Sequence, residues 1–163
     1  MNIIIRQASI DDAEAAYQLI KELAAYENAS EQVTLTLEQF IADGFGNKPT
    51  YFLNVAELTH DDGIKEIVGI TLFFFAYSTW KGRIVYLEDL VVTQKYRRMG
   101  IGQLLLNQLV LFAQQHNAYQ LRWHVLDWNE PAIKLYQKMG MELDPEWITC
   151  RLTKEQIEQY QPL

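Results

Sequence analysis

Two adjacent carboxylates, Glu88 and Asp89, stand near the end of an apolar segment that is rich in β-branched and aromatic residues. A carboxylate in a cleft can hold a cationic ligand, or accept a proton from a reacting group directly or through water. Neighbouring residues of a strand point to opposite faces of its sheet, so the two should not share one role unless a bulge intervenes. The pair indicates a cation site or a proton acceptor, and a solvated strand end is the alternative interpretation.

A basic turn with two glycines, Gly100 and Gly102, follows the same segment and leads directly into an apolar-striped helix. Glycine lets the backbone approach a ligand closely, and the unpaired N–H groups at a helix start favour an anion. The turn lacks the Gly-Lys-Ser/Thr of a phosphate loop and the third glycine of a dinucleotide fingerprint. We expect a pyrophosphate-binding nest here, with a plain tight turn as the alternative.

Hydrophobic periodicity and turn signals predict the elements that position these residues. Strands are expected at 2–6, 50–57, 66–76, 83–92, 120–125 and 147–152, and helices are expected to begin at Ser9 and Thr36 and to span 102–116 and 131–139. A hairpin is expected around Lys81 and Gly82. Antiparallel strands followed by strand–helix–strand–helix–strand are typical of a single α/β or α+β domain, which here spans residues 1–163.

Composition narrows the class of protein. The chain has 163 residues with a net charge of −7. That charge disfavours a nucleic-acid partner, which would need a basic face, and permits a small cationic partner. The longest apolar stretch, 67–76, is about half the roughly 20 residues that a membrane helix needs. With no signal-like leader, we expect a cytoplasmic protein that does not bind a membrane.

Histidine and cysteine give no sign of a metal site. His60, His116 and His124 have no second ligand at metal-binding spacing, so each is expected to be structural. The lone Cys150 cannot form an intramolecular disulfide and is expected to be a small buried apolar residue. No Ser-His-Asp order or nucleophile elbow is present, which disfavours a hydrolase.

At this point the motifs carry a family resemblance. Arg97-x-x-Gly100-x-Gly102 resembles the acetyl-CoA signature of the GNAT superfamily of N-acetyltransferases, and residues 128–140 look like its second cofactor segment. The resemblance implies the GNAT-type fold: a central mixed, mostly antiparallel sheet flanked by about four helices. It implies acetyl-CoA as the acetyl donor, bound by Leu90, Val91, Val92, Arg97, Arg98, Met99, Gly100, Ile101, Gly102, Gln103, Asn129, Pro131, Ala132 and Tyr136.

Shorter segments resemble the diamine (spermidine/spermine) acetyltransferases within that superfamily. They are residues 20–27, 43–46 and 86–89, and Leu126-Asp127-Trp128-Asn129 is more similar to the thialysine-preferring branch. The resemblance implies a homodimer and an amine site that includes Tyr26, Glu27, Trp80, Glu88, Asp89 and Trp147. A helix terminus at 26–27 and ordinary packing of the tryptophans are the alternatives. The spacing around Glu146 departs from the subfamily, which leaves its role open.

Acetyl transfer from a thioester to an amine defines what these residues must supply. An amine like that of lysine carries a proton up to about pH 10, so a group such as Glu88 or Asp89 must accept it before attack. A backbone N–H near Leu90–Val92 is expected to bind the carbonyl oxygen. The resemblance implies that Tyr136 protonates the departing thiolate, and a core tyrosine is the alternative.

The leading hypothesis is an acetyl-CoA-dependent N-acetyltransferase that acts on a small polyamine, diamine or lysine-like amine in a ternary complex. The first alternative is the same reaction on another amine, such as an amino acid or a protein lysine. The second is a non-catalytic acyl-CoA-binding module. Glu88 and Tyr136 are the expected catalytic residues, and they argue against such a module, which would need neither.

Overall fold

The structure is a computed structural model that describes residues 2–162. The chain divides into two compact units, Met1–His124 and Val125–Leu163, and each is described by itself. The first unit holds, in order, β1 (Asn2–Gln7), η1 (Ile10–Asp12), α1 (Ala13–Tyr26), η2 (Ser30–Gln32), α2 (Leu37–Phe45), β2 (Phe52–Thr59), β3 (Lys65–Ser78), β4 (Gly82–Val92), η3 (Gln94–Tyr96), α3 (Ile101–Gln115) and β5 (Gln120–Arg122). The second holds α4 (Glu130–Lys138) and α5 (Lys154–Glu158).

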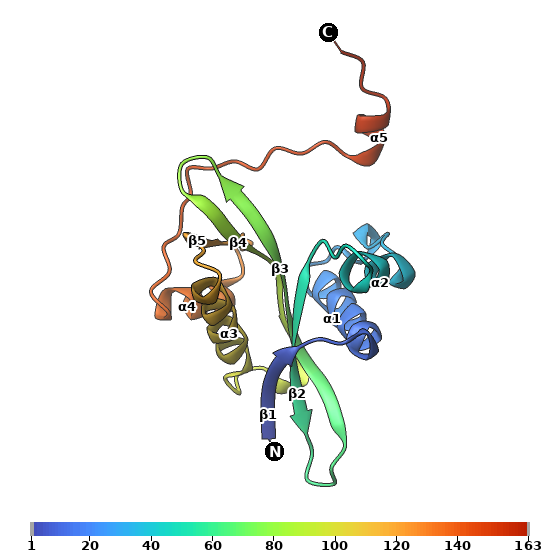
Figure 1. Cartoon of the computed structure of the whole chain (residues 1–163), viewed down its shortest axis with the longest axis vertical. Coiled ribbons are helices and arrows are strands. Elements are labelled where there is room, and N and C mark those ends of the chain that lie inside the picture. Colours follow the sequence, from blue (N-terminus) through green and yellow to red (C-terminus); the bar gives the residue numbers. More distant parts are fainter. Residues whose placement is uncertain (1, 163) are drawn as a thin grey trace. The chain divides into compact units, whose positions relative to one another are not determined.

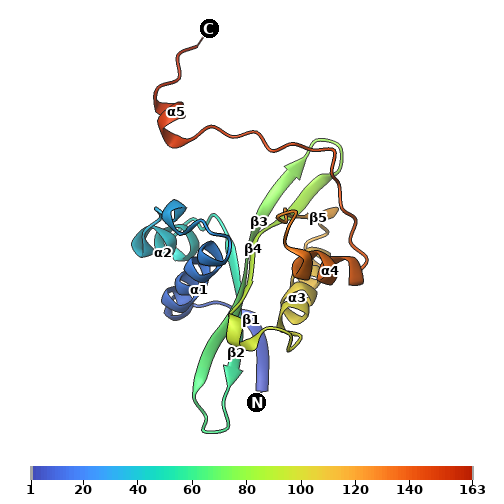
Figure 2. The same ribbon diagram turned by 180° about the vertical axis from the view of Figure 1, so that it is seen from behind.

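The first unit is built on one sheet with the strand order β1-β2-β3-β4-β5. All neighbouring strands are antiparallel except β4 and β5, which are parallel and are connected through α3. Helices α1 and α2 cover one face of the sheet and α3 covers the other (Figure 1), as the reverse view also shows (Figure 2). The predicted mixed, mostly antiparallel sheet with flanking helices is confirmed.

Each face of the sheet has its own apolar core. On one face, Ala16 of α1 and Phe40 of α2 pack with Val55 and Leu72 of the sheet. On the other face, side chains of α3 such as Leu105 pack with strand residues that alternate with the first set. Burial of both strand faces explains why the central strands read as nearly continuous apolar runs.

A β-bulge interrupts the pairing of β3 with β4. Leu72 lies opposite Asp89 and Phe73 lies opposite Leu87, so Glu88 is the additional residue. The bulge shifts the alternation of faces along β4 at this point. A bulge does intervene at Glu88, so Glu88 and Asp89 could act together.

The parallel pairing of β4 with β5 is short. It runs from Ile84 opposite Gln120 to Tyr86 opposite Arg122. In the part of the chain that the structure describes, no strand pairs with this edge of β4 from Leu87 to Val92. The backbone N–H groups along that edge thus have no strand partner in the described chain and can bind a ligand.

Two predicted elements differ from the structure. Residues 147–152 form no strand among the described residues, because no neighbouring strand supplies the hydrogen bonds that a ladder needs, whatever the side-chain propensities. The strand predicted at 120–125 ends at Arg122. Cys150 lies in the irregular segment and is exposed, so the prediction of a buried cysteine is wrong.

The helix boundaries follow the predicted capping residues closely. The Thr36 side chain accepts a hydrogen bond from the Gln39 N–H at the start of α2. At Ser9 the chain first forms the short η1 turn, and α1 begins at Ala13. Arg6 anchors this start, since its guanidinium donates to Asp12 at 2.7 Å and to Glu57 of β2 at 2.7 Å.

Candidate active site

The charges of two carboxylates, Glu88 and Glu27, act on a third, Asp89, at the bulge of β4. Asp89 is half-buried and its pKa is raised to about 6 by burial and by the negative charges of Glu88 and Glu27. Burial likewise raises the pKa of Glu27, which follows the last residue of α1. Unpaired carboxylates held together at a partly buried position repel one another, and a cation between them would relieve that repulsion. The predicted acidic pair thus gains Glu27 as a neighbour, as the amine-site prediction requires.

The bulge also brings Tyr86 to the same face of the sheet as Asp89. Leu72 packs in the core beneath α1, and residues directly opposite each other share a face, so Asp89 faces α1. Phe74 lies two residues beyond Leu72 on that same face and packs against its partner Tyr86, with ring centroids 5.1 Å apart. Without the additional residue, positions 86 and 89 would point to opposite faces.

Tyr86 has a hydrogen-bond partner that the sequence interpretation missed. Its hydroxyl lies 2.5 Å from Nδ1 of His124, which follows β5 by two residues. His124 was expected to be structural, and the available signal was weak: a tyrosine and a histidine on two predicted strands that a predicted helix connects. The pair lies where the β4–β5 ladder ends.

The basic turn presents its backbone in the conformation of an anion-binding nest. Arg98 and Gly100 both have positive φ, at 64° and 80° respectively, and Gly100 is the N-cap of α3. No atom lies within 4 Å of the position that a Cβ on Gly100 would occupy. The positive φ, and not a lack of space, therefore favours glycine at this position. Gly102 is the second residue of α3 and does not have a positive φ.

Arg97 connects the turn to the end of α1. Its Nε donates to the Val92 carbonyl at 2.9 Å, and its guanidinium lies 4.7 Å from the ring centroid of Tyr26. Arg97 and Tyr26 line a groove of about 320 Å³ together with Glu22, Ala25 and Gln94. Glu22, which the sequence analysis did not select, accepts a hydrogen bond from the Gln94 N–H at 2.7 Å and so fixes the start of η3 against α1.

The remaining cofactor candidates of the first unit flank this turn. Leu90, Val91 and Val92 are the last residues of β4, on the edge that no described strand covers. Met99 is exposed, Ile101 is buried in the core beneath α3, and Gln103 is exposed on the first turn of α3. Because its side chain is buried, Ile101 can contact a ligand only through its backbone.

The second unit carries the other cofactor candidates. Asn129 is the N-cap of α4 and its side chain accepts a hydrogen bond from the Ala132 N–H, while Pro131 occupies the first turn. Tyr136 is 7% exposed, and burial raises its pKa to about 12. Its hydroxyl is therefore protonated at neutral pH and holds a proton that it can donate.

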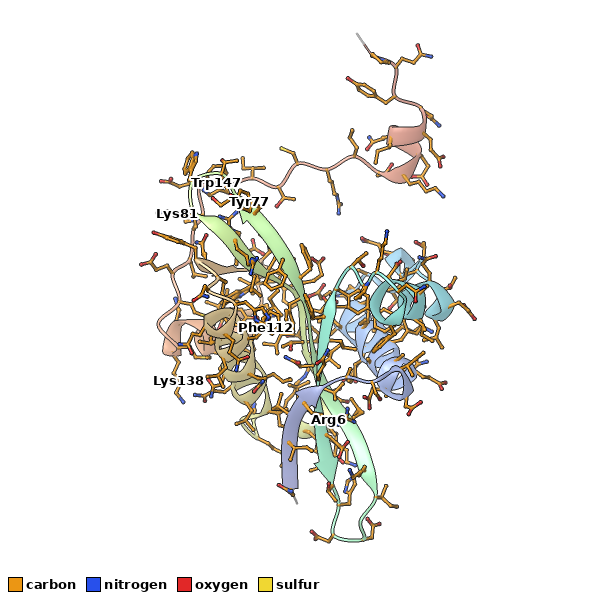
Figure 3. The ribbon with its side chains drawn as sticks, in the orientation of Figure 1. Arg6, Tyr77, Lys81, Phe112, Lys138 and Trp147 are labelled. Atoms are coloured by element: carbon orange, nitrogen blue, oxygen red, sulfur yellow. The ribbon has the colours of Figure 1, made fainter. Side chains whose placement is uncertain are left out.

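The two tryptophans predicted to contact substrate are both exposed. Trp80 is 84% exposed in the turn between β3 and β4. Figure 3 shows Tyr77 and Lys81 of this hairpin at one end of the sheet, well away from Arg6. Asp89 lies seven residues along β4 from Gly82, roughly 20 Å at about 3.3 Å per residue, so Trp80 does not join the acidic cluster of its own chain. Trp147 of the second unit is 75% exposed.

The described chain has neither a cluster of metal ligands nor a membrane-spanning helix. Within residues 2–162, no three His, Cys, Asp or Glu side chains gather as metal ligands. No helix of the described chain has the length and apolar character needed to cross a membrane.

Comparison with known proteins agrees with this arrangement. The sequence model described as the acetyltransferase (GNAT) family matches residues 13–141. A thialysine N-ε-acetyltransferase of Bos taurus is 42% identical over 143 residues, covering 86% of this chain and 84% of that protein. The corresponding enzyme of Mus musculus is 37% identical over 161 residues, covering 95% of each chain. A human spermidine/spermine N(1)-acetyltransferase-like protein 1 is 34% identical, and its match covers 94% of this chain and 23% of that protein.

Solved structures share the fold. An integron cassette protein from the mobile metagenome of V. cholerae superposes with a TM-score of 0.77 at 21% identity, covering 98% of this chain and 97% of the other. An aminoglycoside N-acetyltransferase in complex with CoA has a TM-score of 0.71 at 18% identity, covering 93% and 95%. The family match over most of the chain, the relatives and the fold lead to one conclusion: the chain belongs to the acetyltransferase (GNAT) family and is an N-acetyltransferase.

Proposed function

We propose that the protein transfers the acetyl group of acetyl-CoA to a primary amine of a small polyamine, diamine or lysine-like substrate, by direct attack in a ternary complex. One observation carries this proposal: the negative charges of Glu88 and Glu27 act on the half-buried Asp89 at the bulge of β4, beside the edge that no described strand covers. The names of the thialysine and spermidine/spermine relatives support an amine acceptor of this class.

The residues of the first unit fit acetyl-CoA as the donor. The turn from Arg97 to Gly100 offers backbone N–H groups at the N-terminus of α3, which suit a pyrophosphate. The free edge of β4 at Leu90–Val92 offers N–H groups to a pantetheine arm or to a carbonyl oxygen. When bound, acetyl-CoA supplies the acetyl group as a thioester. The resemblance alone proposes Asn129, Pro131, Ala132 and Tyr136 of the second unit as further acetyl-CoA contacts.

The carboxylates have two tasks in this proposal. Together they hold the cationic acceptor, and one of them removes the proton that prevents the amine from attacking. Asp89 suits proton transfer near neutral pH, because its pKa is raised to about 6. Glu88 is exposed and remains a second candidate for the same step. Tyr136 is proposed to give its proton to the departing thiolate.

Trp80 and Trp147 remain proposed substrate contacts from the resemblance alone. The single domain, the cytoplasmic location and the homodimer also remain predictions made from the sequence.

A panel of amines tests the proposal directly. Thiol release from acetyl-CoA would be followed with spermidine, putrescine, thialysine, lysine and a histone peptide. Release that depends on the small amines supports the proposal, and the ratio of kcat/KM values ranks them. Activity on the peptide alone favours a protein-lysine acetyltransferase, and binding of acetyl-CoA without release favours the non-catalytic module.

A further inference from the structure

Tyr86 of β4 and His124, two residues after β5, form a hydrogen bond across these neighbouring strands. The Tyr86 hydroxyl lies 2.5 Å from His124 Nδ1, and their rings lie edge to face with centroids 5.9 Å apart. Tyr86 is half-buried and His124 is exposed. The His124 ring is hydrogen-bonded to Tyr86 through Nδ1 and is otherwise exposed to water. An imidazole in this position can pass a proton from the tyrosine to water.

The charge of Glu88, one of the three carboxylates, acts on the Tyr86 member of this pair. Tyr86 shares a face of the sheet with Asp89 because of the bulge at Glu88. Its pKa is raised by burial and by the charge of Glu88, and lowered by Arg122. Phe74 packs against the Tyr86 ring and fixes its orientation. Glu88 and Arg122 are thus the charged groups that act on Tyr86, and the same Glu88 acts on Asp89.

We propose that Tyr86 and His124 form the path by which the proton of the acceptor ammonium leaves the site. This inference rests on the proposed function. Tyr86 Oη accepts the proton from the ammonium or from the carboxylate that has taken it, while the Tyr86 hydroxyl proton passes to His124 Nδ1. The imidazolium then releases its Nε2 proton to water. The balance is one proton moved from amine to solvent per turnover, with both residues restored after the ring exchanges its tautomer.

Tyr86 and His124 would help to remove a proton that a half-buried carboxylate such as Asp89 has accepted. A half-buried carboxylate that has accepted a proton is neutral, and it must release that proton before it can hold the next cation. The hydrogen bond between Tyr86 and His124 supplies the outer step of such a route, which a strand edge without a titratable partner would lack.

Two substitutions of His124 separate proton transfer from positioning. His124→Asn keeps an acceptor near the Nδ1 position for the Tyr86 hydroxyl but cannot carry a proton. We expect kcat of His124→Asn and of Tyr86→Phe to fall by about 100-fold, the low end for a lost proton-transfer group, with KM for acetyl-CoA unchanged. Free imidazole should restore part of the kcat of His124→Ala. His116→Asn, at the end of α3 on the other face, is the matched control and should keep wild-type activity.

The results distinguish a proton-transfer role of His124 from a role that only orients Tyr86. If His124→Asn keeps wild-type kcat while His124→Ala loses it, the histidine only orients Tyr86 and the proton path is overturned. Wild-type kcat in all three variants overturns it as well. Thermal unfolding of each variant confirms a folded protein, which is expected because His124 is exposed. A wild-type enzyme that acetylates no amine would instead refute the proposed function itself.

Discussion

The guanidinium of Arg97 lies 4.7 Å from the ring centroid of Tyr26, and this contact joins the end of α1 to the proposed pyrophosphate turn. Tyr26 was selected from the sequence as an amine contact and Arg97 as a cofactor contact. The structure brings these residues, 71 positions apart, onto one groove. The contact therefore links the two proposed substrate sites.

Loss of the Tyr26 ring should weaken acetyl-CoA binding through Arg97. A cation–π contact at a partly exposed position contributes about 0.5–1 kcal/mol, so Tyr26→Leu should raise the acetyl-CoA Kd by a few-fold. Tyr26→Phe keeps the ring face and should bind like the wild type. Calorimetric titration of both variants measures the effect, and equal affinities would show that the contact does not position Arg97.

Gly100 should tolerate only residues that adopt a positive φ. A β-branched residue is strongly disfavoured there, and the left-handed conformation costs an ordinary L-residue about 1–2 kcal/mol. Gly100→Val should therefore turn the N–H groups of the nest away and reduce acetyl-CoA affinity about tenfold or more. Gly100→Asn is the matched control, since Asn populates this region more readily.

Gly102→Val should also weaken acetyl-CoA binding, through its Cβ alone, because Gly102 has no positive φ. A folded Gly102→Val protein with wild-type affinity would remove that residue from the proposed site.

Changing Glu88 and Asp89 to amides should affect polyamines more than monoamines. Removing a partly desolvated partner of a charge typically costs about 2–5 kcal/mol, and exposure of Glu88 places the expected loss near the lower value. The double variant Glu88→Gln/Asp89→Asn should raise KM for spermidine much more than KM for a monoamine of equal length. Higher salt should weaken wild-type binding in the same sense. Equal changes for both amines would indicate that the pair acts only on the reacting nitrogen.

Asp89 should make stability depend on pH in a defined window. Its pKa rises from 3.8 to about 6 on folding, so between these values the folded state binds more protons than the unfolded state. Stability then falls as pH rises through this window, by up to about 3 kcal/mol at 1.36 kcal/mol per pKa unit.

Asp89→Asn should therefore be more stable than the wild type at pH 7 and no more stable at pH 3.5. Urea unfolding at both values measures the difference, with the exposed Asp11→Asn as control. The same gain at both pH values would attribute the effect to packing and not to the charge.

Tyr136→Phe tests the proposed acid of the second unit. With its pKa raised to about 12, the phenol gives its proton uphill to a thiolate whose thiol has a pKa of about 8–9. We expect kcat to fall toward the low end of the usual 10²–10⁴-fold loss for a general acid, with little change in acetyl-CoA affinity.

A structural tyrosine would behave differently. The core-tyrosine alternative predicts a lower melting temperature and an unchanged kcat where chemistry limits the rate. Rapid-quench kinetics and thermal unfolding of the same Tyr136→Phe preparation therefore separate the two roles.

Most local elements, and the turn proposed for the acetyl donor, could be predicted from the sequence because their signals are local. Gly100 and Gly102 stand next to a strand and a helix whose periodicities are continuous in the chain, and Thr36 marks the start of α2 by its own side-chain hydrogen bond. The short motifs 97–102 and 128–140 were sufficient to name the superfamily, which the comparisons confirm.

Only the tertiary structure decided which distant residues act together. Whether Glu88 and Asp89 can cooperate depends on a one-residue bulge, and the register of β3 against β4 that creates it is a property of two strands at once. The same register places Tyr86 on the sheet face of Asp89. The short parallel ladder between β4 and β5 brings His124 to the Tyr86 hydroxyl. The strand expected at 147–152 shows the converse: residue propensity favours a strand, but a strand forms only where a neighbouring edge provides its hydrogen bonds.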